Sequence, residues 1–216
     1  MKDTLLIELL TEELPPKALL RMAHAFRDAL LQGLREDGLA GEDSSATAHA
    51  TPRRLAVSVT GVLDRASDKT VEISGPSVKV GLDADGKPTP ALAGFAKKNG
   101  VAVDDLVQTD TPKGRVFACR KVTAGARLDA GLDLKIEEAL GRLPIPKVMR
   151  WGGGDAQFVR PVHGLVMLHG ARVVPGRVLG LESGNRTLGH RFLSAGPITL
   201  GHADDYERAL REQGRV

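Results

Sequence analysis

The chain has 216 residues, of which 42% are hydrophobic and 26% charged, and it carries a net charge of +3. These values are typical of a globular protein with a buried core, and the length fits one or two domains. Aromatic residues make up only 3% of the chain, which argues against a single-strand binder built as a platform of stacked aromatics. No apolar run approaches the ~18 residues of a membrane span, and Met1 is followed by charged residues and not by a secretory signal. We therefore expect a cytoplasmic protein without a membrane partner.

Sequence patterns in the first part of the chain predict strands and helices in turn. The apolar run over residues 4–10 is typical of a buried strand, although Glu8 lies within it. Pro15-Pro16 suits the first turn of a helix, because an N–H would have no partner there. Apolar residues spaced by three and four from Leu19 to Leu34 give that helix one apolar face. The expected elements are a strand over 4–10, a helix from Lys17 that Gly38 stops, a small polar loop over 41–50, a strand over 55–62 and a turn at Gly75-Pro76.

The second part of the chain is also predicted to contain both strands and helices. Turn residues fill positions 83–88, and Thr89 is a suitable N-cap for a short helix that Asn99-Gly100 would close. The expected elements are a helix over 91–98, a strand over 115–122, a helix over 128–140, an antiparallel meander over 165–181 and a charged helix over 203–213. Because strands and helices mix without a regular repeat, we predict an α+β fold with mixed or antiparallel sheets and packed helices.

Positive charge is concentrated between Arg142 and Arg191. That segment holds 8 Lys or Arg and 2 acids, a net charge of +6, while the whole chain carries +3. A basic segment on a slightly acidic scaffold indicates contact with a polyanion. Arginine suits phosphate because its planar fork donates to two oxygens at once. The alternative is that some of these side chains pair with carboxylates of the scaffold.

Local motifs predict neither a catalytic residue nor a metal site. Adjacent Glu12 and Glu13 would diverge on a strand or a helix, so we interpret them as negative charge at a helix N-terminus and not as an acid/base pair. His163 and His190 lack partners at chelating spacings, which favours a structural role or an RNA contact over a metal. Cys119 lies in an apolar run and is expected to be buried. Phosphate loops, nucleophile elbows and metalloprotease motifs are absent from the sequence, so we expect no cofactor in this chain.

The candidate polyanion-binding residues combine the basic segment with an arginine pair at a turn. Arg53 and Arg54 follow Pro52, and phosphate contact and simple solvation are both open for them. Contacts from Arg and Lys favour the phosphate backbone over base-specific recognition. The full set of candidates is Lys147, Arg150, Arg160, His163, Arg186, His190, Arg191, Arg53 and Arg54.

Six motifs occur in an order that resembles one family closely. They are Thr11–Lys17, Thr51–Ala56, Gly75-Pro76, Pro144–Gly152, Phe158–His163 and Gly189–Phe192. Together they resemble the N-terminal part of the β subunit of bacterial heterotetrameric glycyl-tRNA synthetase, across residues 4–206. One departure lies in the first strand, where Glu8 is followed by Leu9-Leu10, while the family usually has a glycine two positions after this glutamate.

The resemblance implies a division of labour between subunits. In that family the sites for ATP, Mg²⁺ and glycine belong to the separate α subunit of an α2β2 enzyme. The β subunit supplies binding of tRNA(Gly) and is required for charging. It is several times longer than this chain and adds an HD-like domain and an anticodon-binding domain. We therefore expect this chain to be a fragment that is inactive alone.

The resemblance also implies an organisation and a role. Residues 1–200 are expected to form one α+β unit similar to the B3/B4 region of the phenylalanyl-tRNA synthetase β subunit, and residues 201–216 to begin a helical linker. The expected role is non-catalytic support of tRNA(Gly) binding and of glycylation by the α subunit, within an ATP-dependent glycine–tRNA ligase of protein synthesis. Two alternatives stay open: editing-type hydrolysis of mischarged tRNA, and a purely structural module for subunit assembly.

Overall fold

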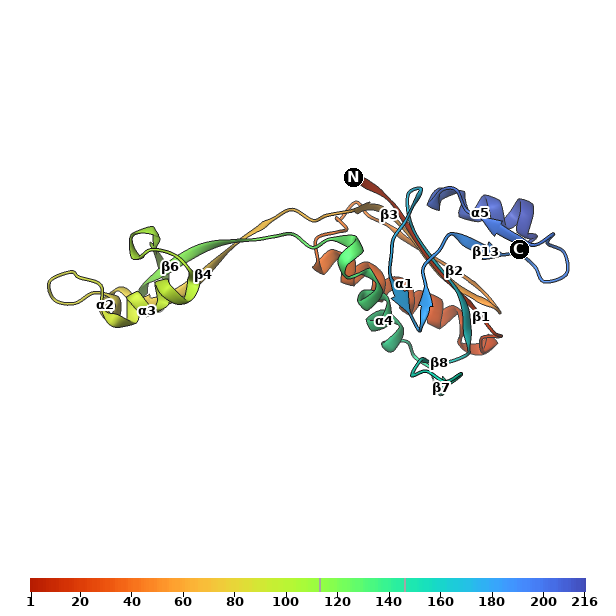
Figure 1. Ribbon diagram of the computed structural model, residues 1–216, viewed down its shortest axis with the longest axis horizontal. Coiled ribbons are helices and arrows are strands. Elements are labelled where there is room, and N and C mark those ends of the chain that lie inside the picture. Colours follow the sequence, from red (N-terminus) through yellow and green to blue (C-terminus); the bar gives the residue numbers. More distant parts are fainter. Residues whose placement is uncertain (113, 146) are drawn as a thin grey trace. The chain divides into compact units, whose positions relative to one another are not determined.

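The computed structural model describes residues 1–112, 114–145 and 147–216, and Figure 1 labels many of its helices and strands. Pro146, which belongs to the fourth of the six motifs, lies outside the described residues. The chain divides into two compact units: unit 1 comprises residues 1–66 and 126–216, and unit 2 comprises residues 67–125. The resemblance implied one α+β unit over residues 1–200, whereas local motifs do not show which elements pack together.

Unit 1 is built on a five-stranded antiparallel sheet with the strand order β10-β9-β1-β3-β2. Short antiparallel pairs, β7–β8, β11–β12 and β13–β14, lie outside that sheet. Before unit 2 the chain forms β1 (Lys2–Thr11), α1 (Pro16–Glu36), β2 (Ala46–Thr51) and β3 (Arg54–Leu63). After unit 2 it forms η2 (Leu128–Ala130), α4 (Leu132–Gly141), β7 (Met149–Arg150), β8 (Gln157–Phe158), β9 (Val162–His169), β10 (Arg172–Val173), β11 (Arg177–Val178), β12 (Leu181–Glu182), β13 (Arg186–Leu188), β14 (Pro197–Thr199), η3 (Ala203–Asp205), α5 (Tyr206–Ala209) and η4 (Leu210–Gly214).

The central strand β1 is buried on both faces of the sheet. Leu5, Ile7 and Leu9 belong to a main core with side chains of α1 and α4. Leu6 belongs to a second core with side chains of β14 and α5. Since successive residues of a strand point to opposite faces, a strand covered on both sides needs the continuous apolar run that the sequence has. Figure 1 shows α1 and α4 on one side of the sheet and α5 on the other.

Helix α1 confirms the predicted amphipathic helix. It begins at Pro16 and ends before Gly38, which has a φ of +73°. Phe26 and Leu30 are both 0% exposed and lie in the main core with residues of the sheet. Burial of each such side chain contributes about 1.5–3 kcal/mol. The expected packing of this helix face on the sheet is therefore confirmed.

Unit 2 combines a three-stranded antiparallel sheet, in the order β4-β6-β5, with short helices. Thr89 caps its longest helix by accepting a hydrogen bond from the Leu92 amide, and Gly100 ends that helix with a φ of +70°, as predicted. Cys119 is buried, as predicted. The elements are β4 (Lys69–Ser77), α2 (Val78–Gly81), α3 (Pro90–Asn99), η1 (Val103–Asp105), β5 (Val107–Thr111) and β6 (Gly114–Thr123).

Some elements differ from the sequence prediction. The expected loop over 41–50 contains most of β2, which pairs with β3, and Gly75-Pro76 lies within β4 and not at a turn. The expected meander over 165–181 is split, because β9 pairs with β10 while β11 pairs with β12. The α+β class with antiparallel sheets is nevertheless confirmed. Within the described residues, no helix combines the length and the apolar character that a membrane crossing requires.

The C-terminal segment forms helical turns, as predicted, through η3, α5 and η4. The resemblance implied that residues 201–216 begin a helical linker. In the structure they belong to unit 1, because Tyr206, Ala209 and Leu210 are buried in the second core. The apolar spacing of these residues was visible in the sequence, but the sheet face that they cover was not.

Candidate binding groove

A groove with a volume of about 810 Å³ lies in unit 1 and brings together residues that are far apart in the sequence. Its volume falls within the range of small-molecule and cofactor sites. Five of the nine candidate residues line it: Arg53, Arg54, His163, His190 and Arg191. Other residues that line it are Leu10, Glu12, Glu13, Thr51, Pro52, Leu188, Gly189, Phe192, Ser194, Gly196, Pro197 and Val216.

Backbone hydrogen bonds hold the groove's segments against one another. The amide of Thr11 donates to the Arg53 carbonyl at 3.0 Å, and the amide of Leu14 donates to the Pro52 carbonyl at 2.6 Å. The amide of Glu12 donates to the Pro161 carbonyl at 2.9 Å. These bonds join the segment after β1, the turn between β2 and β3, and the segment before β9. Three of the six sequence motifs therefore meet at this place.

Glu12 and Arg53 form an ion pair at the groove, with 2.5 Å between the Glu12 Oε2 and the Arg53 Nη2. The hydrogen bond from Arg53 lowers the pKa of Glu12 below its ordinary value, and the positive charges of Arg53, His163 and Arg191 act in the same direction. The interpretation of Glu12 and Glu13 as charge at a helix N-terminus is wrong, because α1 begins at Pro16 and has no acidic residue in its first turn. Glu12 instead neutralises a groove arginine.

Arg54 has a different environment from that of Arg53. Its side chain is only 5% exposed, and its Nε donates to the Oε1 of the fully buried Glu8 at 2.5 Å. Tyr206 donates from its hydroxyl to the same Glu8 oxygen at 2.6 Å, and burial raises the pKa of Tyr206 well above its usual value. Arg54 also donates to the carbonyl of Leu188. Neither alternative considered for Arg54, surface phosphate contact or simple solvation, describes this buried pair.

The segment from Leu188 to Pro197 forms one wall of the groove and is fixed at its start. The amide of His190 donates to the Gly214 carbonyl at 2.6 Å. A Cβ atom on Gly189 would lie 2.5 Å from the Cα of Gly214, so glycine is required for this close approach. Together with the bond from Arg54 to Leu188, these contacts anchor the wall to β3 and to the C-terminal helical turns.

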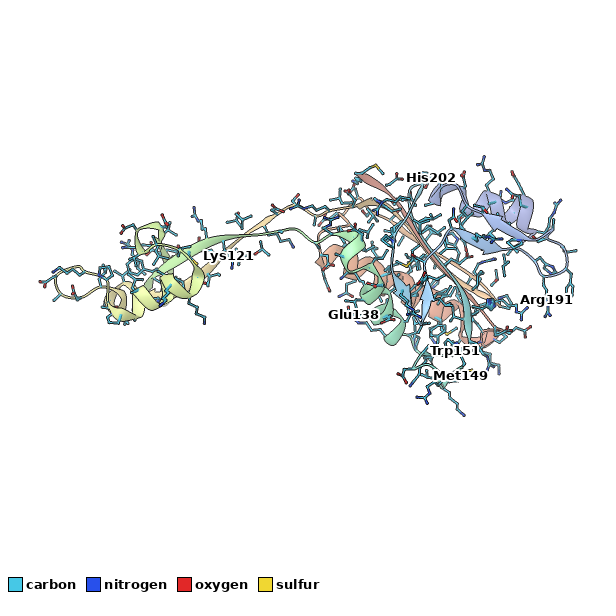
Figure 2. The ribbon with its side chains drawn as sticks, viewed as in Figure 1. Lys121, Glu138, Met149, Trp151, Arg191 and His202 are labelled. Atoms are coloured by element: carbon cyan, nitrogen blue, oxygen red, sulfur yellow. The ribbon has the colours of Figure 1, made fainter. Side chains whose placement is uncertain are left out.

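Phe192 and Arg191 project from this wall. The Phe192 side chain is 82% exposed, and the Cζ of Arg191 lies 5.7 Å from the centre of its ring. Figure 2 labels Arg191 on this part of unit 1. Sequence reasoning selected Arg191 but missed Phe192, although Phe192 ends one of the six motifs. The signal that would have found it is a large aromatic residue beside His190 and Arg191 in a turn.

The other candidates lie outside the residues that line the groove. Lys147 and Arg150 are exposed at the β7–β8 hairpin, where Arg150 lies 3.3 Å from the exposed Asp155. Arg186 is exposed on β13. Arg160 borders the groove, since its Nε donates to the Glu13 carbonyl at 2.9 Å. Figure 2 labels Met149 and Trp151 of the hairpin well apart from Arg191.

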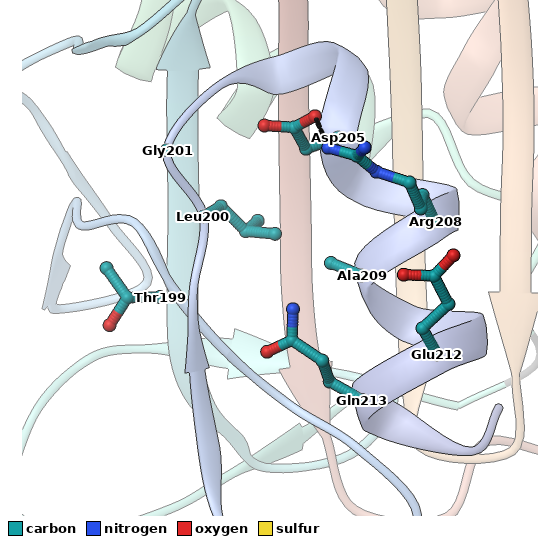
Figure 3. A pocket seen from close by; sticks show the side chains of 8 residues that line it. All are labelled: Thr199, Leu200, Gly201, Asp205, Arg208, Ala209, Glu212 and Gln213. Atoms are coloured by element: carbon teal, nitrogen blue, oxygen red, sulfur yellow. Dashed lines mark hydrogen bonds and ion pairs between the residues drawn. The ribbon is translucent and has the colours of Figure 1, made fainter.

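Another hollow, of about 120 Å³, lies between β14 and the C-terminal helical turns (Figure 3). Asp205 and Arg208 at its edge form an ion pair at 2.5 Å, which neutralises both charges. The lining of this hollow contains none of the candidate residues. The hollow is also much smaller than the groove.

Asp3, His202 and Asp204 form a cluster that the sequence did not suggest, with potential ligand atoms within 4.8 Å of one another. The Nδ1 of His202 accepts a hydrogen bond from the Asp204 amide at 3.2 Å and so caps η3. The Nε2 of His202 lies 3.6 Å from the Asp3 carboxylate. Both ring nitrogens are thus engaged by the protein, and the cluster is explained as a helix cap.

Comparison with known proteins agrees with the motifs. The family described as glycyl-tRNA synthetase beta subunit matches residues 5–216. The glycine–tRNA ligase beta subunits of Neisseria meningitidis serogroup B and of Aromatoleum aromaticum are 49% and 48% identical, each over 216 residues. That of Chromohalobacter salexigens is 48% identical over 206 residues. The alignments cover 100%, 99% and 95% of this chain but only 31%, 31% and 30% of the relatives.

The matches first assign the chain to the aminoacyl-tRNA synthetases. More particularly, the chain belongs to the glycyl-tRNA synthetase β-subunit family, and it spans about 31% of the length of its first relatives. The resemblance drawn from the six motifs is thereby confirmed.

Proposed function

We propose that this chain is a non-catalytic part of the β subunit that supports binding of tRNA(Gly) and its glycylation. The observation that carries this proposal is the groove, which gathers Arg53, His163, His190 and Arg191 from separate motifs. Guanidinium and imidazole groups are suitable donors to the phosphates of an RNA backbone. The identification of glycine as the amino acid, and of its tRNA as the partner, comes from the family and from the names of the relatives.

The proposed whole enzyme is an ATP-dependent glycine–tRNA ligase of the cytoplasm, assembled with an α subunit as α2β2. ATP and Mg²⁺ would be used by the α subunit. The sequence of this chain contains no phosphate loop that would hold a nucleotide. We expect no pyrophosphate exchange when this chain alone meets ATP, glycine and Mg²⁺. A rate above the buffer blank would contradict that expectation.

A salt titration of tRNA(Gly) binding tests the proposed role. Each phosphate that a protein neutralises contributes about −0.7 to −0.9 to the slope of log K against log salt. In the β subunit that carries this chain, Arg191→Ala should flatten the slope by about that amount. Arg150→Ala is the matched control, because Arg150 is exposed but lies outside the groove. Identical slopes for wild type and Arg191→Ala, with unchanged circular dichroism, would refute phosphate binding at this groove.

A second candidate function is editing-type hydrolysis of mischarged tRNA, in a unit similar to the B3/B4 region of the phenylalanyl-tRNA synthetase β subunit. It is favoured by one observation, namely that Glu13 and His163 line the same groove as Arg191. A carboxylate and an imidazole are common general bases. Deacylation of Ala-tRNA(Gly) by the β subunit, abolished by Glu13→Gln or His163→Ala, would place this function first. Equal rates with and without the protein would exclude it.

A further inference from the structure

Among the described residues, Phe192 is the most exposed large apolar side chain, at 82%. A phenylalanine ring is normally buried, so a ring in water beside a groove needs an explanation. The ring's backbone is not loose, because the Phe192 amide donates to the Nδ1 of His190 at 3.2 Å. His190 is in turn bonded through its own amide to Gly214. The fold therefore holds this aromatic ring in solvent.

A positively charged side chain, that of Arg191, lies beside the Phe192 ring. The Cζ of Arg191 lies 5.7 Å from the ring centre, and the ring of His190 lies 6.2 Å from it. Arg53 is neutralised by Glu12, and Arg54 by Glu8. Within the part of the chain that the structure describes, the arginines of the groove that form ion pairs are Arg53 and Arg54, and Arg191 acts on Glu12 only through its charge. The wall thus presents an aromatic face beside a guanidinium that forms no direct ion pair among the described residues.

We propose that this groove binds an unpaired nucleotide of RNA, with its base stacked on Phe192 and its phosphate held by Arg191. The inference rests on the proposed function and narrows it from RNA binding in general to binding of a single-stranded segment. Bases within an A-form helix are stacked on each other, whereas unpaired bases can stack on aromatic side chains and on arginine planes. A groove of about 810 Å³ has room for a ligand of this size.

A single ring also limits how much RNA is recognised. Phe192 is the only Phe, Tyr or Trp among the described residues that line the groove, which agrees with the low aromatic content of 3%. The site is suited to one base and not to a run of stacked bases. Base stacking on a protein aromatic is tolerant of sequence, so specificity for one base is not expected from Phe192.

The same loop provides a matched control for an apolar protein contact. Leu193 is 66% exposed, but it does not line the groove. A protein partner that docks on this loop through apolar contact would use both Phe192 and Leu193. A stacked base would use the aromatic ring alone.

The test uses the intact β subunit and two stem-loop RNAs, one with a short single-stranded overhang and one with a blunt end. A fluorescent adenine analogue in the overhang reports stacking, and fluorescence anisotropy reports affinity. We expect tighter binding of the overhang probe. Stacking on Phe192 should quench the fluorescence of the adenine analogue. Phe192→Ala should weaken binding of the overhang probe by about 5- to 150-fold and should restore that fluorescence. Phe192→Trp should preserve both signals, and Leu193→Ala should change neither.

The outcomes separate this inference from the proposed function. Equal affinity for the two probes, with a blunt-end affinity that still depends on Arg191, would overturn the single-strand inference alone. Equal losses from Phe192→Ala and Leu193→Ala would also overturn it and would indicate a protein contact. If neither probe nor tRNA(Gly) binds, both proposals are wrong. Because Phe192 is exposed, the variants should fold, and circular dichroism checks this.

Discussion

Arg53, Arg54 and Arg191 all line the groove, but they differ in what surrounds their guanidinium groups. Arg54 is buried with Glu8, and removing one partner of a buried ion pair typically costs 3–5 kcal/mol because the other charge stays behind. Arg53 is paired near the surface with Glu12, where such pairs contribute little to stability. Arg191 forms no ion pair with either of these carboxylates. The same residue type thus serves structure at one position and is proposed to serve binding at another.

The Glu12–Arg53 pair gives a prediction about pH. The pKa of Glu12 is lowered from 4.5, mainly by the hydrogen bond from Arg53. A depressed carboxyl pKa means that the pair's contribution is present above about pH 4.5 and is lost as the pH falls through the folded-state value. We expect the NMR titration of the Glu12 carboxyl carbon to have its midpoint below pH 4.5, and Arg53→Gln to move it upward. Glu13→Gln is the control and should leave the midpoint near its wild-type position. If the midpoint of the Glu12 titration is the same in Arg53→Gln as in wild type, the pairing is contradicted.

Among the elements, the wall of the groove depends on the C-terminal helical turns. The amide of His190 donates to the carbonyl of Gly214, and Gly189 packs directly on that backbone. Arg54 holds the carbonyl of Leu188 from the other direction, while Tyr206 of α5 donates to the carboxylate that neutralises Arg54. Helix α5 and the wall are therefore connected through one buried network. This network makes the groove a pre-formed feature of unit 1.

Substitution of Gly189 tests this connection. A Cβ on Gly189 would lie 2.5 Å from backbone atoms of Gly214, so Gly189→Ala must displace the wall. Overpacking of this kind typically costs 1–3 kcal/mol, and urea unfolding should detect it. Gly201→Ala is the matched control, because a Cβ there would meet nothing within 4 Å. If both variants unfold at the same urea concentration as wild type, the wall is not fixed by Gly214.

The elements also show what the sequence could and could not predict. The strand β1 and the helix α1 follow from apolar patterns that are read within a few residues, and both were predicted. Strand β2 was missed because its small and polar residues resemble a loop, and it is defined by pairing with β3. Arg54 was assigned to the surface because its partner Glu8 lies on another strand. The groove could not be predicted from the sequence for the same reason, since its lining comes from segments that only tertiary packing brings together.

For the molecule as a whole, unit 2 interrupts unit 1 without separating its ends. The amide of Ala66 donates to the carbonyl of Ala126 at 2.8 Å, and a β-bridge joins Arg65 to Arg127. The chain thus leaves unit 1 and re-enters it at neighbouring points. Insertion of one compact unit into another at such a point is tolerated because the host needs only to keep its ends close. The residues that line the groove all lie in unit 1.

This arrangement predicts that unit 1 folds and keeps its groove without unit 2. In the β subunit, replacement of residues 67–125 by a short Gly-Ser linker should leave the structure of unit 1 intact, since closing a short loop costs little. Affinity for the overhang RNA should stay at the wild-type level at matched salt, and Arg191→Ala should still weaken it. The same linker in place of α4 is the control and should unfold unit 1, because Leu132, Ile136 and Leu140 belong to the main core.

Circular dichroism reports whether each variant is folded, and fluorescence anisotropy reports its affinity for the overhang RNA. A folded β subunit that loses RNA affinity on removal of unit 2 would show that unit 2 takes part in binding, and an unfolded one would show that it is no independent insertion.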